Sequence, residues 1–149
     1  MTSIHASTVV EAPASKVFAY AIDPENATTL VEGLTEWRVL DDRLAGMGAR
    51  FAAVFKFGPA TYEATLEITQ WEPDRLVTWA SASGANQSLS WRFDPGEADA
   101  GAWTDVQFEL GFEPPDGLAR TLFSLTVEPI LRTRAVETVA TLKRRVESG

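Results

Sequence analysis

The sequence offers few side chains suited to acid–base or nucleophilic chemistry. It contains no cysteine and a single histidine, His5. This composition excludes thiolate nucleophiles, disulfides, cysteine-ligated metals and any metal site built on several histidines. The sequence shows no phosphate-binding glycine loop, no Ser-His-Asp set and no paired acid–base carboxylates. We therefore expect neither a metal nor a cofactor.

Tyr62 is the strongest candidate for a polar group inside the fold, because a phenol can donate a hydrogen bond to a carbonyl or orient a ligand. Thr104 and Thr126 are the other inward candidates. A core tyrosine whose hydroxyl reaches water or backbone is, however, the preferred interpretation of Tyr62. Arg134 could reach a cavity mouth and meet an acidic ligand head, although a solvated helix face is the simpler interpretation.

The elements that must position these residues are mostly strands. Residues 61–69 alternate most strictly, with Tyr62, Ala64, Leu66 and Ile68 on one face and threonine or glutamate on the other. Such alternation predicts an antiparallel sheet with one dry and one wet face. Further strands are expected over residues 3–11, 37–40, 50–57, 75–81, 87–93 and 103–113. The facing of 75–81 stays open, and Trp103 and Val106 differ in parity, which predicts a bulge between them.

Three helices complete the pattern. Pro13 opens the first, over 14–22, and Asp23 with Pro24 starts a second, short one that ends near Gly33. A long C-terminal helix is expected from a cap at Asp116 to about residue 147. Its front half, 118–130, is apolar on more than one side, and Pro129 should kink or interrupt it, so that this half could act as a lid.

These elements predict an α+β fold in which a curved antiparallel sheet wraps a long C-terminal helix and leaves a pocket between them. The aromatic side chains of the dry face would line that pocket, or else pack together as an ordinary core. The residues expected to contact an apolar ligand are Phe51, Phe55, Phe57, Tyr62, Leu66, Trp91, Phe108, Phe123, Val127 and Ile130.

Length and charge narrow the classes of function. The 149 residues suit one domain, 1–149, and the net charge of −8 disfavours nucleic acid and anionic membranes as partners. No signal peptide and no membrane-spanning run are apparent, so we expect a cytoplasmic protein without stable membrane insertion. A homodimer through the outer side of 118–130 is a further hypothesis.

Several local segments resemble the START-like superfamily, also called SRPBCC, in the order in which that family uses them. They are Val9 to Phe18 with its Ala-Pro pair, Asp23 after the first helix, Gly46 to Arg50, Glu72 to Leu76, and Leu142 to Glu147. The resemblance covers almost the whole chain and is nearest to the polyketide cyclase/dehydrase-like branch. It implies a helix-grip fold, β-α-α-β6-α.

The resemblance implies several functions, because this superfamily includes aromatases and cyclases, lipid-transfer domains, plant allergens, hormone receptors and chaperone activators. Non-catalytic binding or transport of a hydrophobic small molecule, lipid or polyketide-like, is the leading hypothesis. A cyclase or dehydratase acting on a polyketide-like substrate is the second, and it requires a cluster of inward polar groups around Tyr62. A protein-interaction or chaperone-activator module is the third.

Overall fold

The computed structural model describes residues 2–57, 60–84, 86–98, 101–113 and 117–149. Within these ranges, it does not describe the side chains of residues 57, 60, 84, 97, 98, 119, 120, 123 and 124. A strand comes first, then short helices, six strands and one long helix. The elements are β1 (Thr2–Val10), α1 (Ala14–Ile22), a 3₁₀ turn η1 (Pro24–Asn26), α2 (Ala27–Leu30), β2 (Leu34–Val39), β3 (Arg50–Phe57), β4 (Ala60–Glu72), β5 (Leu76–Gly84), β6 (Gln87–Ala98), β7 (Gly101–Phe112) and α3 (Leu118–Ser148).

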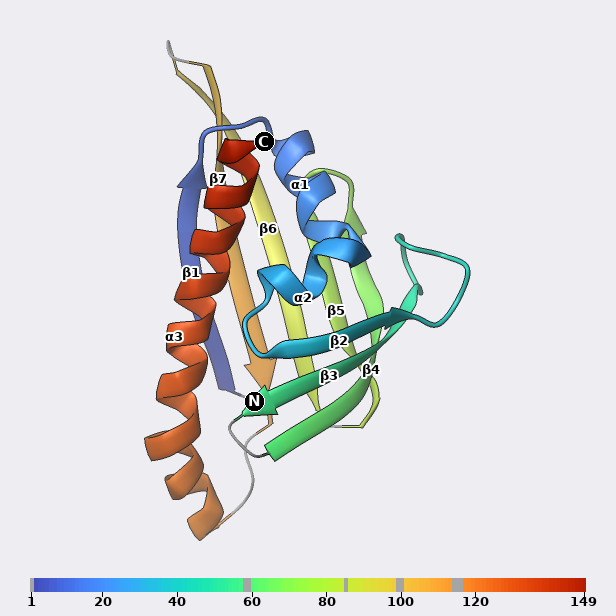
Figure 1. Ribbon diagram of the computed structural model, residues 1–149, viewed down its shortest axis with the longest axis vertical. Coiled ribbons are helices and arrows are strands. Elements are labelled where there is room, and N and C mark those ends of the chain that lie inside the picture. The colour runs from blue at the N-terminus through green and yellow to red at the C-terminus, as the bar shows by residue number, and fades with distance from the viewer. Residues whose placement is uncertain (1, 58–59, 85, 99–100, 114–116) are drawn as a thin grey trace.

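The seven strands form one antiparallel sheet in the order β1-β7-β6-β5-β4-β3-β2. The sheet is strongly bent, because β2, β3 and β4 run across the direction of β1, β6 and β7 (Figure 1). The expected α+β helix-grip architecture is therefore confirmed. The helical cover is shared, however: α3 lies along β1, whereas α1 and α2 cover the neighbouring part of the concave face (Figure 1).

The local signals for the short helices produce the expected turns. The Asp23 side chain accepts a hydrogen bond from the backbone N–H of Glu25 at 3.0 Å, and Pro24 occupies the first position of η1. This is the cap-and-proline start that the sequence predicts. Gly33 adopts φ +90°, a left-handed conformation that favours glycine, and so reverses the chain between α2 and β2.

The facing of β5, which the sequence leaves open, is decided by its neighbour β6. Val77 pairs with Trp91 and Trp79 pairs with Leu89, and all four side chains are buried on the concave face. The predicted bulge near Trp103 is wrong. The β6–β7 register runs without a shift, so that Trp103 lies over Gly96 while Thr104 takes the buried position and donates to the Ala12 carbonyl at 2.7 Å.

The long helix is continuous through Pro129, so an interruption at this residue is wrong, whereas a kink there stays a prediction. The residues of α3 that are buried all lie at or beyond Leu131, within the part of the helix whose side chains the structure describes. The front half instead exposes Leu118, Leu122 and Leu125, at 87%, 63% and 71%. The predicted cap residue Asp116 lies outside the described residues. The homodimer expected through this face stays a prediction, which sedimentation over a range of concentrations would test.

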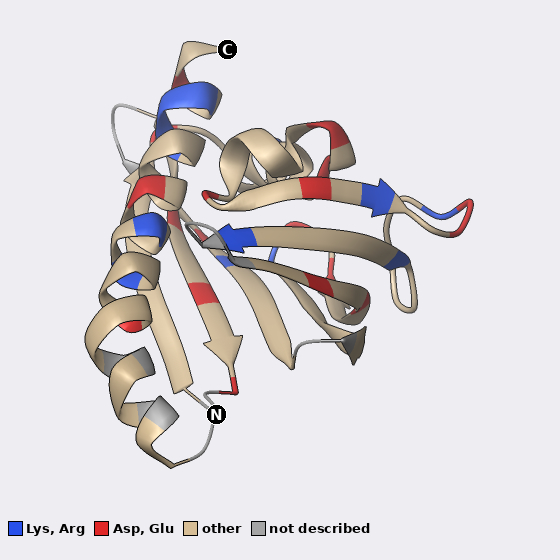
Figure 2. Ribbon diagram, turned by 60° about the horizontal axis from the view of Figure 1, so that its bottom comes forward, with Lys and Arg blue, Asp and Glu red and all other residues tan. Residues whose placement is uncertain are grey.

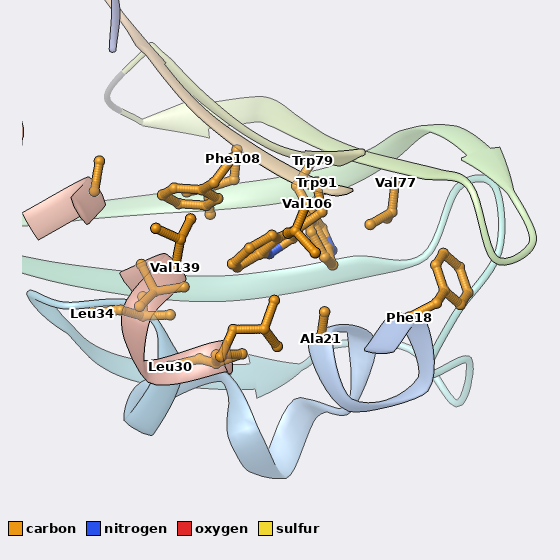
Figure 3. Close-up of a cluster of buried hydrophobic side chains, with 14 of the residues drawn as sticks. Phe18, Ala21, Leu30, Leu34, Val77, Trp79, Trp91, Val106, Phe108 and Val139 are labelled. Atoms are coloured by element: carbon orange, nitrogen blue, oxygen red, sulfur yellow. The ribbon is translucent and has the colours of Figure 1, made fainter. Parts of the chain in front are cut away.

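The core lies between the concave face of the sheet and the helices. Ala21 of α1 and Leu30 of α2 point toward Trp79 and Trp91 of the sheet (Figure 3). Aromatic rings contact one another across this layer: Trp91 and Phe108 have ring centroids 4.5 Å apart, and Trp37 stacks on Phe51 at 4.8 Å. The aromatic face that the sequence predicts is thus mostly a packed core, and the open space lies toward one end of it.

Candidate ligand-binding site

An outer cavity of about 200 Å³ lies between the middle of α3, the turn after α2 and the ends of β3, β4, β6 and β7. It opens to solvent between α3 and the sheet. The residues that line it are Val31, Glu32, Phe55, Tyr62, Asn86, Gln87, Leu110, Gly111, Phe112, Glu113, Val127, Leu131, Arg134 and Thr138. The helix and the curved sheet therefore enclose a space that neither fills.

The wall of the outer cavity is largely apolar. Phe55 contributes a buried side chain from the sheet and Leu131 one from α3, and Val31 adds a buried β-branched side chain from the turn after α2. Leu110 and Phe112 continue the wall along β7 and are partly buried against the core. An apolar wall with a few polar groups at defined points is the usual composition of a small-molecule site.

Polar side chains of the outer cavity are held by hydrogen bonds to the surrounding elements. Thr138, which is 1% exposed, accepts a hydrogen bond from the Glu32 backbone N–H at 3.2 Å and donates to the Arg134 carbonyl at 2.8 Å. These bonds fasten the turn after α2 to α3. Across the mouth, Asn86 Nδ2 lies 3.5 Å from a carboxylate oxygen of Glu113.

The structure brings three of the predicted ligand contacts, Phe55, Tyr62 and Val127, to the outer cavity. Tyr62 is 42% exposed at the mouth, so its ring is not a core group. Phe51, Leu66, Trp91 and Phe108 are each at most 2% exposed and belong to the packed core, although Trp91 also borders a small inner cavity. Ile130 lies on the solvent side of α3, 45% exposed. The structure does not describe the side chains of Phe57 and Phe123.

Several lining residues that come from strand ends and turns were not predicted from the sequence. Glu32, Asn86 and Glu113 lie just outside the strands or helices, where alternation gives no direction. Leu110 and Phe112 continue the alternating face of β7 and could have been found by extending that face to its end. Of the two threonines considered as inward groups, Thr104 is buried far from the mouth and Thr126 is exposed, donating to Leu122.

The inner cavity is much smaller, about 20 Å³, and lies deeper between the sheet and the short helices. Val31 lines both cavities. The inner wall contains Trp79, whose indole Nε1 is buried without a hydrogen-bond partner among the described residues. The inner cavity has room for a single group of about the size of a water molecule.

Groups able to hold a metal ion do not cluster in the described residues: no three histidine, aspartate or glutamate side chains lie together there. His5 lies on the outer face of β1, 2.9 Å from the Gln107 side chain. Along α3, groups of basic residues are separated by single acidic ones (Figure 2). Among the described residues, none of the helices has the length and apolar character needed to cross a membrane.

A sequence model of the family described as polyketide cyclase/dehydrase and lipid transport matches residues 1–147. The chain belongs to this family. The resemblance to the START-like superfamily is thereby confirmed, and so is its helix-grip fold. In this chain, the outer cavity occupies the space between the gripped helix and the sheet. This cavity and the membership of the family together support a fold that binds hydrophobic ligands.

Solved structures share this fold. TTHA0849 from Thermus thermophilus has a TM-score of 0.80 at 18% identity, covering 99% of this chain and 98% of that one. DR_A0006 from Deinococcus radiodurans has a TM-score of 0.71 at 21% identity, covering 99% of each chain. The Zhui aromatase/cyclase from a Streptomyces species has a TM-score of 0.73 at 12% identity, covering 98% of this chain and 93% of that one. Comparison with curated protein sequences finds no match.

Proposed function

We propose that this protein binds an apolar small molecule in the outer cavity and keeps it out of water during storage or transfer. The observation that supports this most is the shape of the cavity: an apolar wall around Phe55 and Leu131 that lies open between helix and sheet. A packed core normally leaves no voids of this size, because empty space forfeits dispersion contacts. A bound ligand would restore those contacts.

The volume limits the size of the ligand. An engineered apolar cavity of about 150 Å³ accommodates benzene. The outer cavity, at about 200 Å³, is somewhat larger, and its opening lets part of a longer molecule protrude. We therefore propose a ligand with one or two rings, or a short acyl segment, inside the cavity, and not a complete long-chain lipid.

Native mass spectrometry of the purified protein and titration with N-phenyl-1-naphthylamine, an uncharged dye that fluoresces out of water, test this proposal. Val127→Phe should weaken dye binding about tenfold or more, because the larger side chain fills the cavity from α3. Leu125→Phe is the matched control, since Leu125 is on the same helix but 71% exposed. No co-purified ligand and no dye uptake by the wild type would overturn the proposal.

A second candidate function is catalysis of a cyclase or dehydratase reaction, and the polar groups at the mouth favour it. The second hypothesis required inward polar side chains around Tyr62, and Glu32, Glu113 and Arg134 line the same cavity as Tyr62. A phenol and a carboxylate could donate and accept protons at a carbonyl-bearing substrate. Tyr62→Phe should then abolish turnover of a polyketide-like substrate while dye binding persists; unchanged turnover would remove Tyr62 from the mechanism.

A further inference from the structure

A stripe of exposed apolar side chains runs along the solvent face of α3. Leu118, Leu122, Leu125 and Val136 are 87%, 63%, 71% and 59% exposed. At about 100° of rotation per residue, the four positions fall within roughly 60° of one another around the helix axis. Their spacing follows the seven-residue repeat by which one helix packs against another. The stripe therefore has the geometry of a helix–helix contact.

The two halves of this stripe have different surroundings. In the back half, Val136 and Ala140 line an open groove between α3 and β1, together with Ser7 and Thr8 of the strand. The front half extends past the ends of β1 and β7, so that its leucines project from the body of the protein (Figure 1). One end of α3 thus offers protruding leucines, and the other end offers a groove with apolar side chains in its wall.

A second copy of α3 in antiparallel orientation brings the leucines and the groove together. With Pro129 on the two-fold axis, residues that are equally far from Pro129 along the helix lie opposite each other. Leu122 then meets Val136 of the partner subunit, and Leu118 meets Ala140 of the partner subunit. Each contact occurs twice, because a two-fold interface uses the same surface on both copies. The groove of each copy thereby covers the leucines of the other.

The charged side chains near the stripe favour this orientation. In a parallel pair, Arg132 and Lys143 would each face the same residue of the partner, and like charges in contact repel. In the antiparallel pair, Arg132 lies opposite Thr126 of the partner subunit. The ion pair between Arg132 and Glu128, at 2.9 Å, lies next to the axis, so each Glu128 carboxylate also approaches Arg132 of the partner subunit. The charge pattern therefore complements itself in the antiparallel pair.

We propose that two copies of this chain associate through α3 as an antiparallel dimer with two-fold symmetry. The dimer leaves the helix-grip fold of each copy intact and does not depend on a bound ligand. A contact along one helix is small, so the dissociation constant should lie in the micromolar range. The net charge of −8 disfavours an anionic membrane as the alternative partner of the leucines.

Sedimentation velocity over a range of concentrations tests the interface. The wild type should pass from monomer to dimer as its concentration rises. Leu122→Glu should weaken this association about tenfold or more, because a carboxylate would be buried against Val136 of the partner subunit without an opposite charge. Leu44→Glu is the matched control and should associate as the wild type does, since Leu44 is 58% exposed in the loop between β2 and β3.

A mixing experiment tests the register of the two helices. Val136→Lys alone should also weaken association. In an equimolar mixture of Leu122→Glu and Val136→Lys, the new carboxylate faces the new ammonium group at one contact, and the native pair remains at the other. A heterodimer should therefore form with an affinity within a few-fold of that of the wild type. A mixture that associates no better than its components would overturn the proposal.

A wild type that stays monomeric at every concentration would also overturn the proposal. If that monomer bound vesicles of neutral phosphatidylcholine, and Leu122→Glu abolished this binding, the stripe would belong to a membrane contact instead. Neither result would affect the proposed binding function, because the dye titration of the outer cavity measures that function separately.

Discussion

The guanidinium of Arg134 on α3 donates a hydrogen bond from Nη1 to the main-chain oxygen of Lys56, at 2.7 Å. Lys56 lies at the end of β3, so this bond joins the helix to the sheet beside the mouth of the outer cavity. The same guanidinium lies over Gly33, where a Cβ would overlap it. Arg134 thus connects three segments that are distant in sequence: α3, the end of β3 and the turn after α2.

Replacing Arg134 by methionine should loosen the mouth. The variant keeps much of the side-chain packing but loses the bond to Lys56, and a hydrogen bond to a charged group contributes about 1.5–3 kcal/mol. We expect a lower unfolding free energy and a several-fold faster release of bound dye in stopped-flow measurements. Arg132→Met is the control, since Arg132 forms an exposed pair with Glu128 on the same helix. Equal release rates in the two variants would contradict this role.

Replacing Gly33 by alanine should destabilise the protein more than the same change at Gly46. Both glycines have φ +90°, so both substitutions carry the same conformational penalty of about 1 kcal/mol or more. A Cβ at Gly33 also overlaps Arg134, whereas at Gly46 it meets nothing within 4 Å. The difference between the two variants in urea unfolding therefore measures the contact. It should disappear in an Arg134→Met background, and its persistence there would show another cause.

Substitutions at Phe51 and at Phe55 should distinguish an effect on the unfolding free energy from an effect on ligand affinity. Both lie on the same face of β3 and are 1% and 5% exposed, but only Phe55 lines the outer cavity. Phe51 instead stacks on Trp37. Leucine at either position should lower the unfolding free energy by about 1–2 kcal/mol. Dye affinity should change several-fold for Phe55→Leu and stay constant for Phe51→Leu; a reversed order would place the binding site deeper in the core.

Glu147 makes one part of the stability dependent on pH. A hydrogen bond from Lys143, at 2.8 Å, and one from the Glu11 backbone N–H, at 2.9 Å, lower the pKa of the Glu147 carboxyl from its ordinary value. The charged form therefore stabilises the fold above the pKa of the unfolded chain, about 4.3, and this contribution is lost as pH falls through the lower folded-state pKa.

The free-energy difference between wild type and Glu147→Gln should therefore be largest near neutral pH and shrink on acidification. Denaturant unfolding at several pH values between about 7 and 3 measures this difference. Lys143→Met removes the first of the two donors and should reproduce part of the effect. A difference that stays constant over this range would contradict the assigned role of Glu147.

The fold could be predicted from the sequence because the strands have one wet and one dry face. In β4, Ala64, Leu66 and Ile68 are all buried, as their alternation requires. The facing of β5 could not be predicted, because Leu76, Val77 and Trp79 are all buried and only pairing with Leu89 and Trp91 decides which two face the helices. Register between strands is tertiary information, which a single strand does not carry.

The candidate site was harder to predict than the fold. Alternation identifies the dry face but does not distinguish a residue that packs against another ring, such as Phe108, from one that borders empty space, such as Phe55. That distinction depends on where α3 lies along the sheet. The polar residues at the mouth, Glu32 and Glu113, follow helix α2 and strand β7 and have no periodic neighbours to orient them.

The position of β1 at the edge of the sheet has a consequence for how the chain acquires its shape. Among the described strands its neighbour is β7, so Thr2 pairs with Phe112 and Val10 with Thr104. Because β1 is synthesised before β7, it must remain without this partner until β7 has been synthesised. Such non-local pairing slows folding toward the range of milliseconds to seconds. We expect nascent chains that stop before β7 to expose the inner side of β1 and to depend on chaperones for solubility.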